Sequence, residues 1–529
     1  MLHATYEVRF RHLDKYSDIY PMSRTPSTDL FTLIKALTKT EKRYVKQELG
    51  RHRIGEVNQS EVLFDAVDSL TLYNEESIKE RYARYGFTHR LPEAKRELVV
   101  VILRAMRQFH ANRSVYRRAM AAILDAEFLR LRGLFALAEQ RLAAATSDVQ
   151  LLQHDALEVL LLSAQREVLR MQDKLTLSGQ TNERMSLTAA AQRLTESSRV
   201  EDLADRMDHL VAVSGRSPTP EVKALANNLK QAGDALHPIS SPASQNHWLR
   251  MLSKKALFID NDPSLALTYD LSRLGVIEQS EQQKRVNAHQ WVNLTSSVAL
   301  RLILLGRITE ARIHCSRLEA YWEQRNEQLT PHNQQSLAAT IVNLQIQLAL
   351  QSNDFEEFYS GLPVTDAILD SINTPSLVET VVVCQFNIAL ILFGLHKYRA
   401  CNKRLFVLDD YDSSLRAEVH EARRLLAIVC HLEQQNESVV ISLIRAERRI
   451  RKSSTIPTDV EVLLTLVKKI VDMPPGLKLN NAYRAAQVKL QNINQEGSEP
   501  VTNLFDFQAW VDARLNKKSW RAVVNSRRS

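Results

Sequence analysis

The stretch Leu304-Leu305-Gly306-Arg307-Ile308-Thr309-Glu310-Ala311-Arg312-Ile313-His314-Cys315-Ser316-Arg317-Leu318 decides the fold expected for the rest of the chain. It is typical of the turn and second helix of a helical hairpin. Gly306 provides the backbone freedom that a helix end requires. Ala311, Cys315 and Leu318 follow at spacings of four and three residues, which place them on one helix face. Because one hairpin cannot bury its own apolar face, the pattern predicts stacked neighbours.

Weaker copies of this pattern recur along the chain. The template is a turn residue, an apolar residue two positions later, and apolar or small residues five, nine and twelve positions later. Complete copies start at Gly133 and His396, and partial copies start at Asp262, Asn353 and Gln435. The turns from Asp262 to Gln435 are roughly 39–47 residues apart, near the range of two-helix repeats. The sequence therefore predicts an all-α fold built from helical hairpins.

The turn and second helix resemble the tetratricopeptide repeat, whose second helix opens with a glycine, an aromatic residue and an alanine. The first-helix tryptophan and the closing proline of that family are missing, and the period exceeds its roughly 34 residues. The resemblance implies a tetratricopeptide-like α-solenoid over residues 246–472. The alternative interpretation is that any antiparallel helical protein contains some matches to this template.

Composition excludes several other folds and sites. The chain has 13 glycines in 529 residues, far below the usual fraction of roughly 7%, which argues against Rossmann units, sandwiches and glycine-rich phosphate loops. Cys315, Cys384, Cys401 and Cys430 lie far apart in apolar helical patterns. They are expected to be reduced core residues of a cytoplasmic protein. No stretch approaches the roughly 18 uninterrupted apolar residues of a membrane span, and no signal peptide is recognised.

The chain is expected to divide into five parts. Residues 1–27 have no sustained period and are interpreted as a flexible leader, with Met22 as a candidate for the true start. The remaining parts are a helical module at 28–118, helical hairpins at 119–236, the repeat array at 246–472, and a capping helix with a basic tail at 473–529. A terminal cap is expected because a repeat array must hide its last open face.

A basic stripe lies on the second predicted helix of the N-terminal module. Thr38 and Glu41 have the spacing of a capping box at the start of this helix. The stripe consists of Lys39, Lys42, Arg43, Lys46, Arg51 and Arg53. It could contact nucleic acid, as a helix-turn-helix reader or through phosphates, or an acidic partner. A plain solvated face is favoured instead, because Glu41 and Glu48 share the helix.

Both ends of the chain resemble one group of proteins. The run Leu30-Phe31-Thr32-Leu33-Ile34-Lys35-Ala36-Leu37-Thr38-Lys39-Thr40-Glu41-Lys42-Arg43-Tyr44-Val45-Lys46 is similar to the opening of uncharacterised helical proteins from Bacteroidota-type bacteria. The C-terminal run Phe505-Asp506-Phe507-Gln508-Ala509-Trp510-Val511 is similar to their ending. Members of that group begin near the position of Met22. The resemblance implies a bacterial family and no known activity.

No motif for catalysis is found. The chain lacks a Walker loop, HExxH, GxSxG and paired-cysteine metal motifs, so no catalytic residue, metal site or cofactor is predicted. His110, His154, His289 and His431 have no partner at ligand spacing and are expected to be structural. The sequence therefore predicts a non-enzymatic, cytoplasmic interaction scaffold for a protein or peptide partner, with no membrane contact. The alternative is a regulator that binds nucleic acid through the basic stripe.

Overall fold

The computed structural model describes residues 27–51, 58–111, 114–172, 177–214, 218–239, 241–413, 415–450, 458–473, 476–495 and 504–528. All regular structure in these ranges is helical and no strand occurs in them, so the all-α prediction is confirmed. The chain divides into two compact units, residues 1–111 and 112–529. The predicted leader up to residue 26, including Met22, lies outside the described residues.

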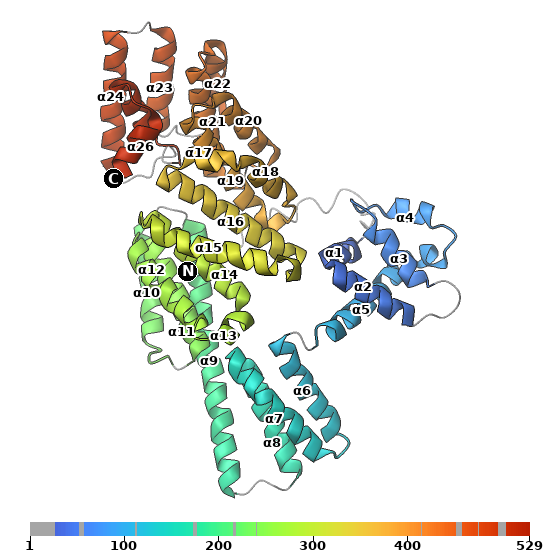
Figure 1. Cartoon of the computed structure of the whole chain (residues 1–529). Coiled ribbons are helices and arrows are strands. Elements are labelled where there is room, and N and C mark those ends of the chain that lie inside the picture. Colours follow the sequence, from blue (N-terminus) through green and yellow to red (C-terminus); the bar gives the residue numbers. More distant parts are fainter. Residues whose placement is uncertain are drawn as a thin grey trace, which may run out of the picture. The chain divides into compact units, whose positions relative to one another are not determined.

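The first unit is a small helical module. Its elements are α1 (Asp29–Ala36), α2 (Lys39–Arg51), α3 (Gln59–Asp68), α4 (Glu75–Arg81), η2 (Gly86–Arg90) and α5 (Leu91–Phe109) (Figure 1). The predicted capping box at the start of α2 is confirmed. Glu41 accepts a hydrogen bond from the Thr38 backbone N–H at 2.7 Å, and the Thr38 hydroxyl accepts one from the Glu41 N–H at 3.2 Å. These two bonds satisfy donors that a helix start would otherwise leave unpaired.

The second unit contains the rest of the chain. Its first elements are α6 (Val115–Arg130), α7 (Phe135–Leu152), α8 (Asp155–Met171), α9 (Leu177–Ser214), α10 (Pro220–Asp234), α11 (Pro242–Lys254), η3 (Lys255–Ile259), α12 (Pro263–Ile277) and α13 (Glu281–Val286). Next come α14 (Ala288–Leu304), α15 (Ile308–Arg325), η4 (Asn326–Gln328), α16 (Pro331–Ser352), α17 (Phe355–Ser360), α18 (Leu362–Ser371), η5 (Pro375–Leu377), α19 (Val378–Gly394) and α20 (Tyr398–Val407). The last are η6 (Leu408–Asp410), α21 (Ala417–Glu433), α22 (Glu437–Ile450), α23 (Thr458–Asp472), α24 (Leu477–Gln495), α25 (Phe507–Asn516) and α26 (Trp520–Arg528).

Five of the predicted hairpin turns have the expected backbone conformation. Gly133, Gly306, Asn353, His396 and Gln435 are left-handed, with φ of 71°, 71°, 65°, 58° and 60°. A left-handed residue after a helix turns the chain out of the helical path. The pairs α6 with α7, α14 with α15, α16 with α17, α19 with α20 and α21 with α22 meet at these turns. The five turns are therefore confirmed.

The complete copies of the template bury their inward residues. After Gly306, the inward residues Ala311, Cys315 and Leu318 are all buried. The corresponding buried residues after Gly133 and His396 are Ala138, Leu142, Ala145, Cys401, Leu405 and Leu408. A small Ala or Cys at the first of these positions lets two helices approach closely, and the larger residues then fill the space between them.

The turn of the hairpin predicted at Asp262 lies one residue earlier than expected, although two of the three predicted inward residues, Leu267 and Leu274, are buried. The left-handed residue is Asn261, with φ of 54°, and Asp262 caps α12 by accepting a hydrogen bond from the Leu265 N–H at 2.9 Å. Leu271, which was predicted to face inward, is consequently 41% exposed. Counted from Asn261, the positions five, nine and twelve residues later hold Ala266, Asp270 and Arg273. This hairpin therefore places charged residues at two positions that are apolar in the complete copies.

Successive hairpins of the second unit contact one another. Helix α14 packs on α15 and α16, α16 packs on α19, and α17 also packs on α19. Helix α19 packs on α20 and α21, and α21 packs on α22 (Figure 1). The hairpins that contain the turns at Gly306, Asn353 and His396 therefore contact one another in chain order.

The predicted C-terminal helix is present as α25, and the predicted basic tail folds as a further helix, α26. The ring of Phe505 lies 4.9 Å from that of Phe393 on α19 and 5.0 Å from that of Trp520 on α26. Arg521 pairs with Glu356 at 2.5 Å. These aromatic contacts and ion pairs hold the tail against α17 and α19.

The segment Pro375–Gly394, which contains α19, is long and apolar enough to cross a membrane by length and composition alone. It is the one such helix in the described part of the chain, and 67% of its 18-residue window is buried inside the protein. Glu379 and Gln385 interrupt its apolar run, so it is not an uninterrupted apolar stretch. Its burial is that of a central core helix.

Candidate functional site

A groove of about 760 Å³ runs along α15, α16, α17 and α18 in the second unit. Its floor is apolar and includes Ile341, Val342 and Leu348 of α16, Phe358 of α17 and Ile368 of α18. A volume of this size lies within the range of known ligand and peptide pockets, roughly 300–1,000 Å³. The groove therefore offers a concave apolar surface that can receive side chains from another molecule.

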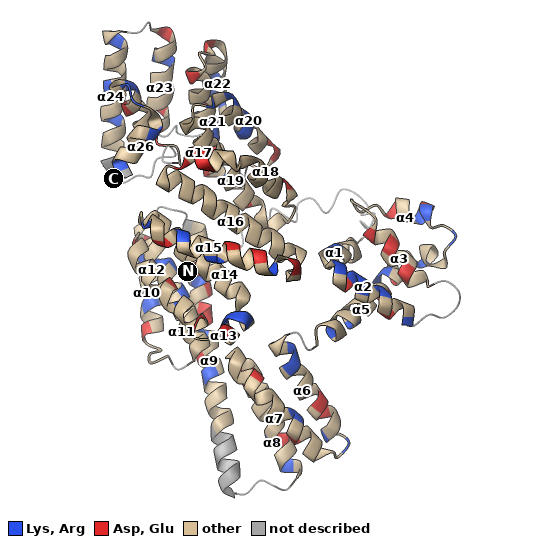
Figure 2. Ribbon diagram, viewed as in Figure 1, with Lys and Arg blue, Asp and Glu red and all other residues tan. Residues whose placement is uncertain are grey.

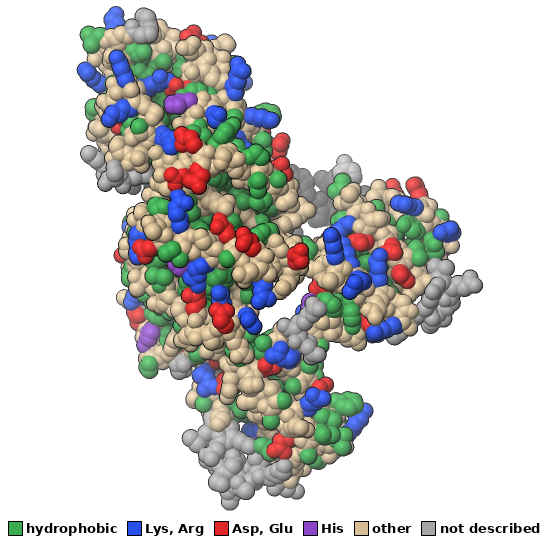
Figure 3. All heavy atoms as spheres, viewed as in Figure 1, with side chains coloured by type: hydrophobic (Ala, Val, Ile, Leu, Met, Phe, Trp, Pro, Cys, Tyr) green, Lys and Arg blue, Asp and Glu red, His purple; other side chains and the backbone are tan. Residues whose placement is uncertain are grey.

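Carboxylates dominate the rim of this groove. Glu319 and Glu323 of α15 lie with Asp354 and Glu357 at the start of α17, and Arg312 is the single cation among the lining residues. Arg312 donates a hydrogen bond to Asp354 at 2.6 Å. Figure 2 marks acidic residues on the ribbons of α15 and α17, and Figure 3 shows acidic side chains on the surface in the same region. The rim carries a surplus of negative charge and favours a positively charged partner.

The groove exists because one hairpin departs from the template. The second helix of the Asn353 hairpin is split into α17 and α18, with the break at Gly361. Pro363 stands at the first turn of α18 and has no N–H for a bond to the preceding turn, so one continuous helix cannot form here. Two short helices cover the flank of α16 less completely than one long helix would. The sequence template already fails at this hairpin, at Thr365.

The groove offers binding contacts and no activated nucleophile among its described residues. Burial raises the pKa of the Cys315 thiol to about 12, so the thiol stays protonated at neutral pH. Glu319 accepts a hydrogen bond from Gln345 at 2.8 Å, which orients its carboxylate along the rim. The arrangement suits recognition by shape and charge.

The basic stripe predicted on α2 is largely paired with carboxylates. Lys42 lies 2.6 Å from Asp68 and Lys46 lies 2.6 Å from Asp65, both on α3. Arg51 pairs with Glu48 within α2. Lys39 and Arg43 are exposed, and Arg53 lies outside the described residues. The stripe therefore has less free positive charge for phosphates than its sequence suggests (Figure 2).

The sequence could not reveal this pairing. Asp65 and Asp68 are three residues apart and so share one face of α3, which is visible in the sequence. Nothing in the sequence shows that this face lies beside α2. The pairing depends on how the helices of the first unit pack on their shared core, which includes Ile34, Val45 and Phe64.

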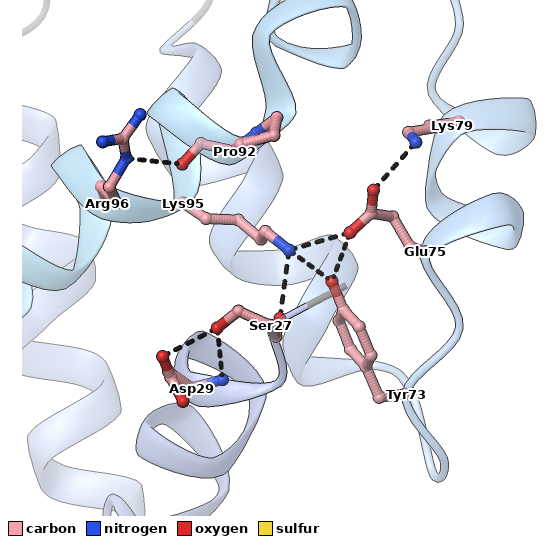
Figure 4. Close-up of polar contacts among 8 residues, drawn as sticks. All are labelled: Ser27, Asp29, Tyr73, Glu75, Lys79, Pro92, Lys95 and Arg96. Carbon is pink, nitrogen blue, oxygen red and sulfur yellow. Dashed lines mark hydrogen bonds and ion pairs between the residues drawn. The ribbon is translucent and has the colours of Figure 1, made fainter. Parts of the chain in front are cut away.

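A buried polar cluster in the first unit centres on Lys95 of α5 (Figure 4). Its ammonium group donates to the Ser27 carbonyl at 3.1 Å, the Tyr73 hydroxyl at 2.9 Å and a Glu75 carboxylate oxygen at 2.8 Å. The other oxygen of Glu75 lies 2.8 Å from Lys79. Every donor of Lys95 has a partner, and burial raises the pKa of Tyr73. The cluster therefore ties α5 to the start of α4.

We expect the stability of this cluster to depend on pH. Burial alone would raise the pKa of Glu75, but hydrogen bonds from Lys79 and Lys95 outweigh it and lower the pKa from 4.5 to about 2. The stabilisation is present above the unfolded value near 4.5 and is lost as pH falls toward 2. In the full-length chain, hydrogen-exchange protection of α4 and α5, corrected for intrinsic rates, should fall between pH 5 and 3. The variant Glu75→Gln should lose this pH dependence, whereas Glu76→Gln, at an exposed neighbouring residue, should keep it. An unchanged pH dependence in Glu75→Gln would contradict the assignment of the effect to Glu75.

The other residues considered in the sequence analysis have structural surroundings. The imidazole of His110 lies 2.6 Å from Glu41, and that of His154 caps α8 by accepting a hydrogen bond from the Leu157 N–H at 3.3 Å. The Sγ atoms of buried Cys401 and Cys430 are 3.3 Å apart. Across the described ranges, no group of three His, Cys, Asp or Glu residues is placed to hold a metal ion.

The fold and the groove together define an all-α protein of consecutive helical hairpins with an acidic, apolar-floored binding surface. Comparison of the chain with known protein families, curated proteins and solved structures detects no match. The function is therefore argued from the groove itself.

Proposed function

We propose that the protein is a non-enzymatic interaction scaffold that binds a basic, amphipathic segment of a partner protein in the groove along α15–α18. The proposal rests on one observation above others: an apolar floor is bordered by four carboxylates and one arginine. A helix with an apolar face and flanking lysines or arginines matches both features. Helix-in-groove recognition uses apolar anchors spaced one helical turn apart.

The arrangement of hairpins supports a tetratricopeptide-like α-solenoid as the framework of this scaffold. Left-handed turns recur at Gly306, Asn353, His396 and Gln435, and the hairpins contact one another in chain order. In such arrays each repeat packs on its neighbours, and extended surfaces remain for partners. The C-terminal helices α25 and α26 would then act as the terminal cap.

Charge in the groove gives a direct test. Glu323 and Glu357 are both exposed, so the double substitution Glu323→Lys/Glu357→Lys should leave the fold intact. A displayed library of helical peptides selected on the full-length protein should yield basic, amphipathic sequences. We expect these peptides to bind the double variant about tenfold or more weakly, because each unfavourable charge contact costs on the order of 1 kcal/mol.

The matched control is Glu281→Lys/Glu310→Lys, which changes net charge equally at exposed residues that do not line the groove. Its peptide affinity should equal that of the unmodified protein. A second variant, Val364→Glu, probes the apolar edge at a side chain that is 67% exposed. Peptides that bind all three variants equally, or that leave hydrogen exchange of α15–α18 unchanged, would contradict the proposal.

A further inference from the structure

A second cavity, of about 640 Å³, lies apart from the groove and has a different chemistry. Helices α11, α12 and α14 form its walls, and the ends of α7 and α13 and one residue of α9 complete it. Carboxamide side chains line these walls and include Gln245, Asn246, Gln290 and Asn293. Each carboxamide can both donate and accept a hydrogen bond. We refer to this space as the polar cavity.

The polar cavity lies at a template hairpin with two charged inward positions, whereas the Gln435 hairpin has one, Glu447. Asp270 and Arg273 of α12 occupy the positions held by Cys315 and Leu318 in the Gly306 hairpin, and Asp270 is only 2% exposed. Charged groups at such positions cost desolvation energy that an apolar pair would not. Their presence here needs a reason beyond packing.

Among the residues that line the cavity, the cations Arg250, Lys254 and Arg273 outnumber the one carboxylate, Asp208. A further group of charges lies next to Arg273. Arg273 donates to Asp270 at 3.3 Å, and Arg301 of α14 approaches the other oxygen of Asp270 at 3.7 Å, too far for a hydrogen bond. Both guanidinium groups are mostly buried. One carboxylate thus faces two cations. A buried network that served packing alone would be expected to balance its charges.

Two buried nitrogen atoms without a hydrogen-bond partner lie beside this surplus. Arg250 Nε and His247 Nδ1, both on α11 and both lining the cavity, are buried without a hydrogen-bond partner in the described structure. Arg250 uses another nitrogen to reach Asp205 at 2.5 Å, and Arg273 donates to Asn246 at 2.9 Å. Lys254 pairs with Asp208 at 2.9 Å at the edge of the cavity. Guanidinium groups favour oxyanions such as phosphate because their donors match its geometry.

We propose that the polar cavity binds a small phosphorylated, hydroxyl-rich molecule, with its phosphate on Arg250 and Arg273 and its hydroxyls on the carboxamide walls. The volume suits a small molecule of this class. Burial lowers the pKa of His247, so its imidazole is neutral at neutral pH and contributes a hydrogen bond and no charge. The site is separate from the groove, and the proposal does not depend on the proposed scaffold function.

Calorimetric titration and thermal unfolding of the full-length protein test this site. The probes are AMP and ribose 5-phosphate, compared with adenosine and ribose at matched ionic strength. We expect saturable binding and a raised Tm with the phosphorylated probes only, because ligand binding to the native state stabilises it. Arg250→Gln should weaken binding about tenfold or more, since a hydrogen bond to a charged group is typically worth at least 1.4 kcal/mol.

Controls separate binding from folding. Asp205, the partner of Arg250, is 63% exposed, so Arg250→Gln should fold normally; its unfolding curve without ligand checks this. Arg206→Gln, at a 63% exposed arginine outside the cavity lining, should bind as the unmodified protein does. The proposal is overturned if neither phosphorylated probe binds, if Arg250→Gln binds them unchanged, or if citrate binds and the phosphorylated probes do not.

Discussion

The substitution Asp270→Asn should destabilise the second unit by roughly 3–5 kcal/mol, because it removes a buried carboxylate that faces two buried guanidinium groups. Asparagine keeps the size of the side chain, so the loss would report charge and not volume. Burial already lowers the pKa of both Arg273 and Arg301, which reflects the cost of holding these cations away from water. Without Asp270, Arg301 would lose the carboxylate that offsets this cost, and Arg273 would keep only Asp208 and its hydrogen bond to Asn246.

Urea denaturation followed by tryptophan fluorescence measures this effect. All five tryptophans, Trp248, Trp291, Trp322, Trp510 and Trp520, belong to the second unit, so the signal reports that unit alone. Asp202→Asn is the matched control, because Asp202 is 68% exposed and its pair with Arg206 is on the surface; it should cost under about 1 kcal/mol. Adding Arg301→Met to Asp270→Asn should recover part of the lost stability. An Asp270→Asn variant as stable as the control would show that the surplus charge is solvated.

The substitution Trp510→Ala should cost a similar roughly 3–5 kcal/mol, the range for removing a large buried aromatic side chain. Trp510 is buried on α25 and donates a hydrogen bond from Nε1 to Glu433 of α21 at 2.8 Å. Its ring lies 6.3 Å from that of Tyr483 on α24. The side chain thus joins α21, α24 and α25, and its removal leaves a cavity at the point where the C-terminal helices close the core.

Two further variants distinguish the contributions of Trp510. Trp510→Phe keeps most of the ring and loses the bond to Glu433, so it should cost less than the alanine variant. Phe406→Ala is the control, since Phe406 is 71% exposed and its loss should change stability little. Far-UV circular dichroism should accompany fluorescence, because Trp510 itself contributes to the emission. A loss for Trp510→Ala no larger than that of Phe406→Ala would refute a capping role for α25.

Features set by neighbouring residues were predictable from the sequence. The capping box of Thr38 and Glu41 and the left-handed turns at Gly306 and His396 depend on contacts within three to five residues, and the structure has them. The turn before α12 shows the limit of predictions from neighbouring residues. Asn261 and Asp262 are both turn formers, and the choice between them decides whether Leu271 or Asp270 faces inward.

Which basic residues remain available to bind a partner was harder to predict from the sequence. In the sequence, Lys42 and Lys46 belong to one basic stripe. In the structure, Lys42 pairs with Asp68 and Lys46 with Asp65, across the interface between two helices. In the basic C-terminal tail, Arg521 likewise pairs with Glu356, which is far away in the sequence. In each case the deciding partner lies on another element, and periodicity carries no information about which elements meet.

The sequence by itself therefore determined the helices, the turns and the apolar faces, because backbone hydrogen bonds and side-chain periodicity act over a few residues. Only the tertiary structure decided where the acidic groove opens, which basic residues are paired, and that Asp270 faces Arg301. Those features arise where packing brings faces of different helices together, and residues from several helices form both proposed binding sites.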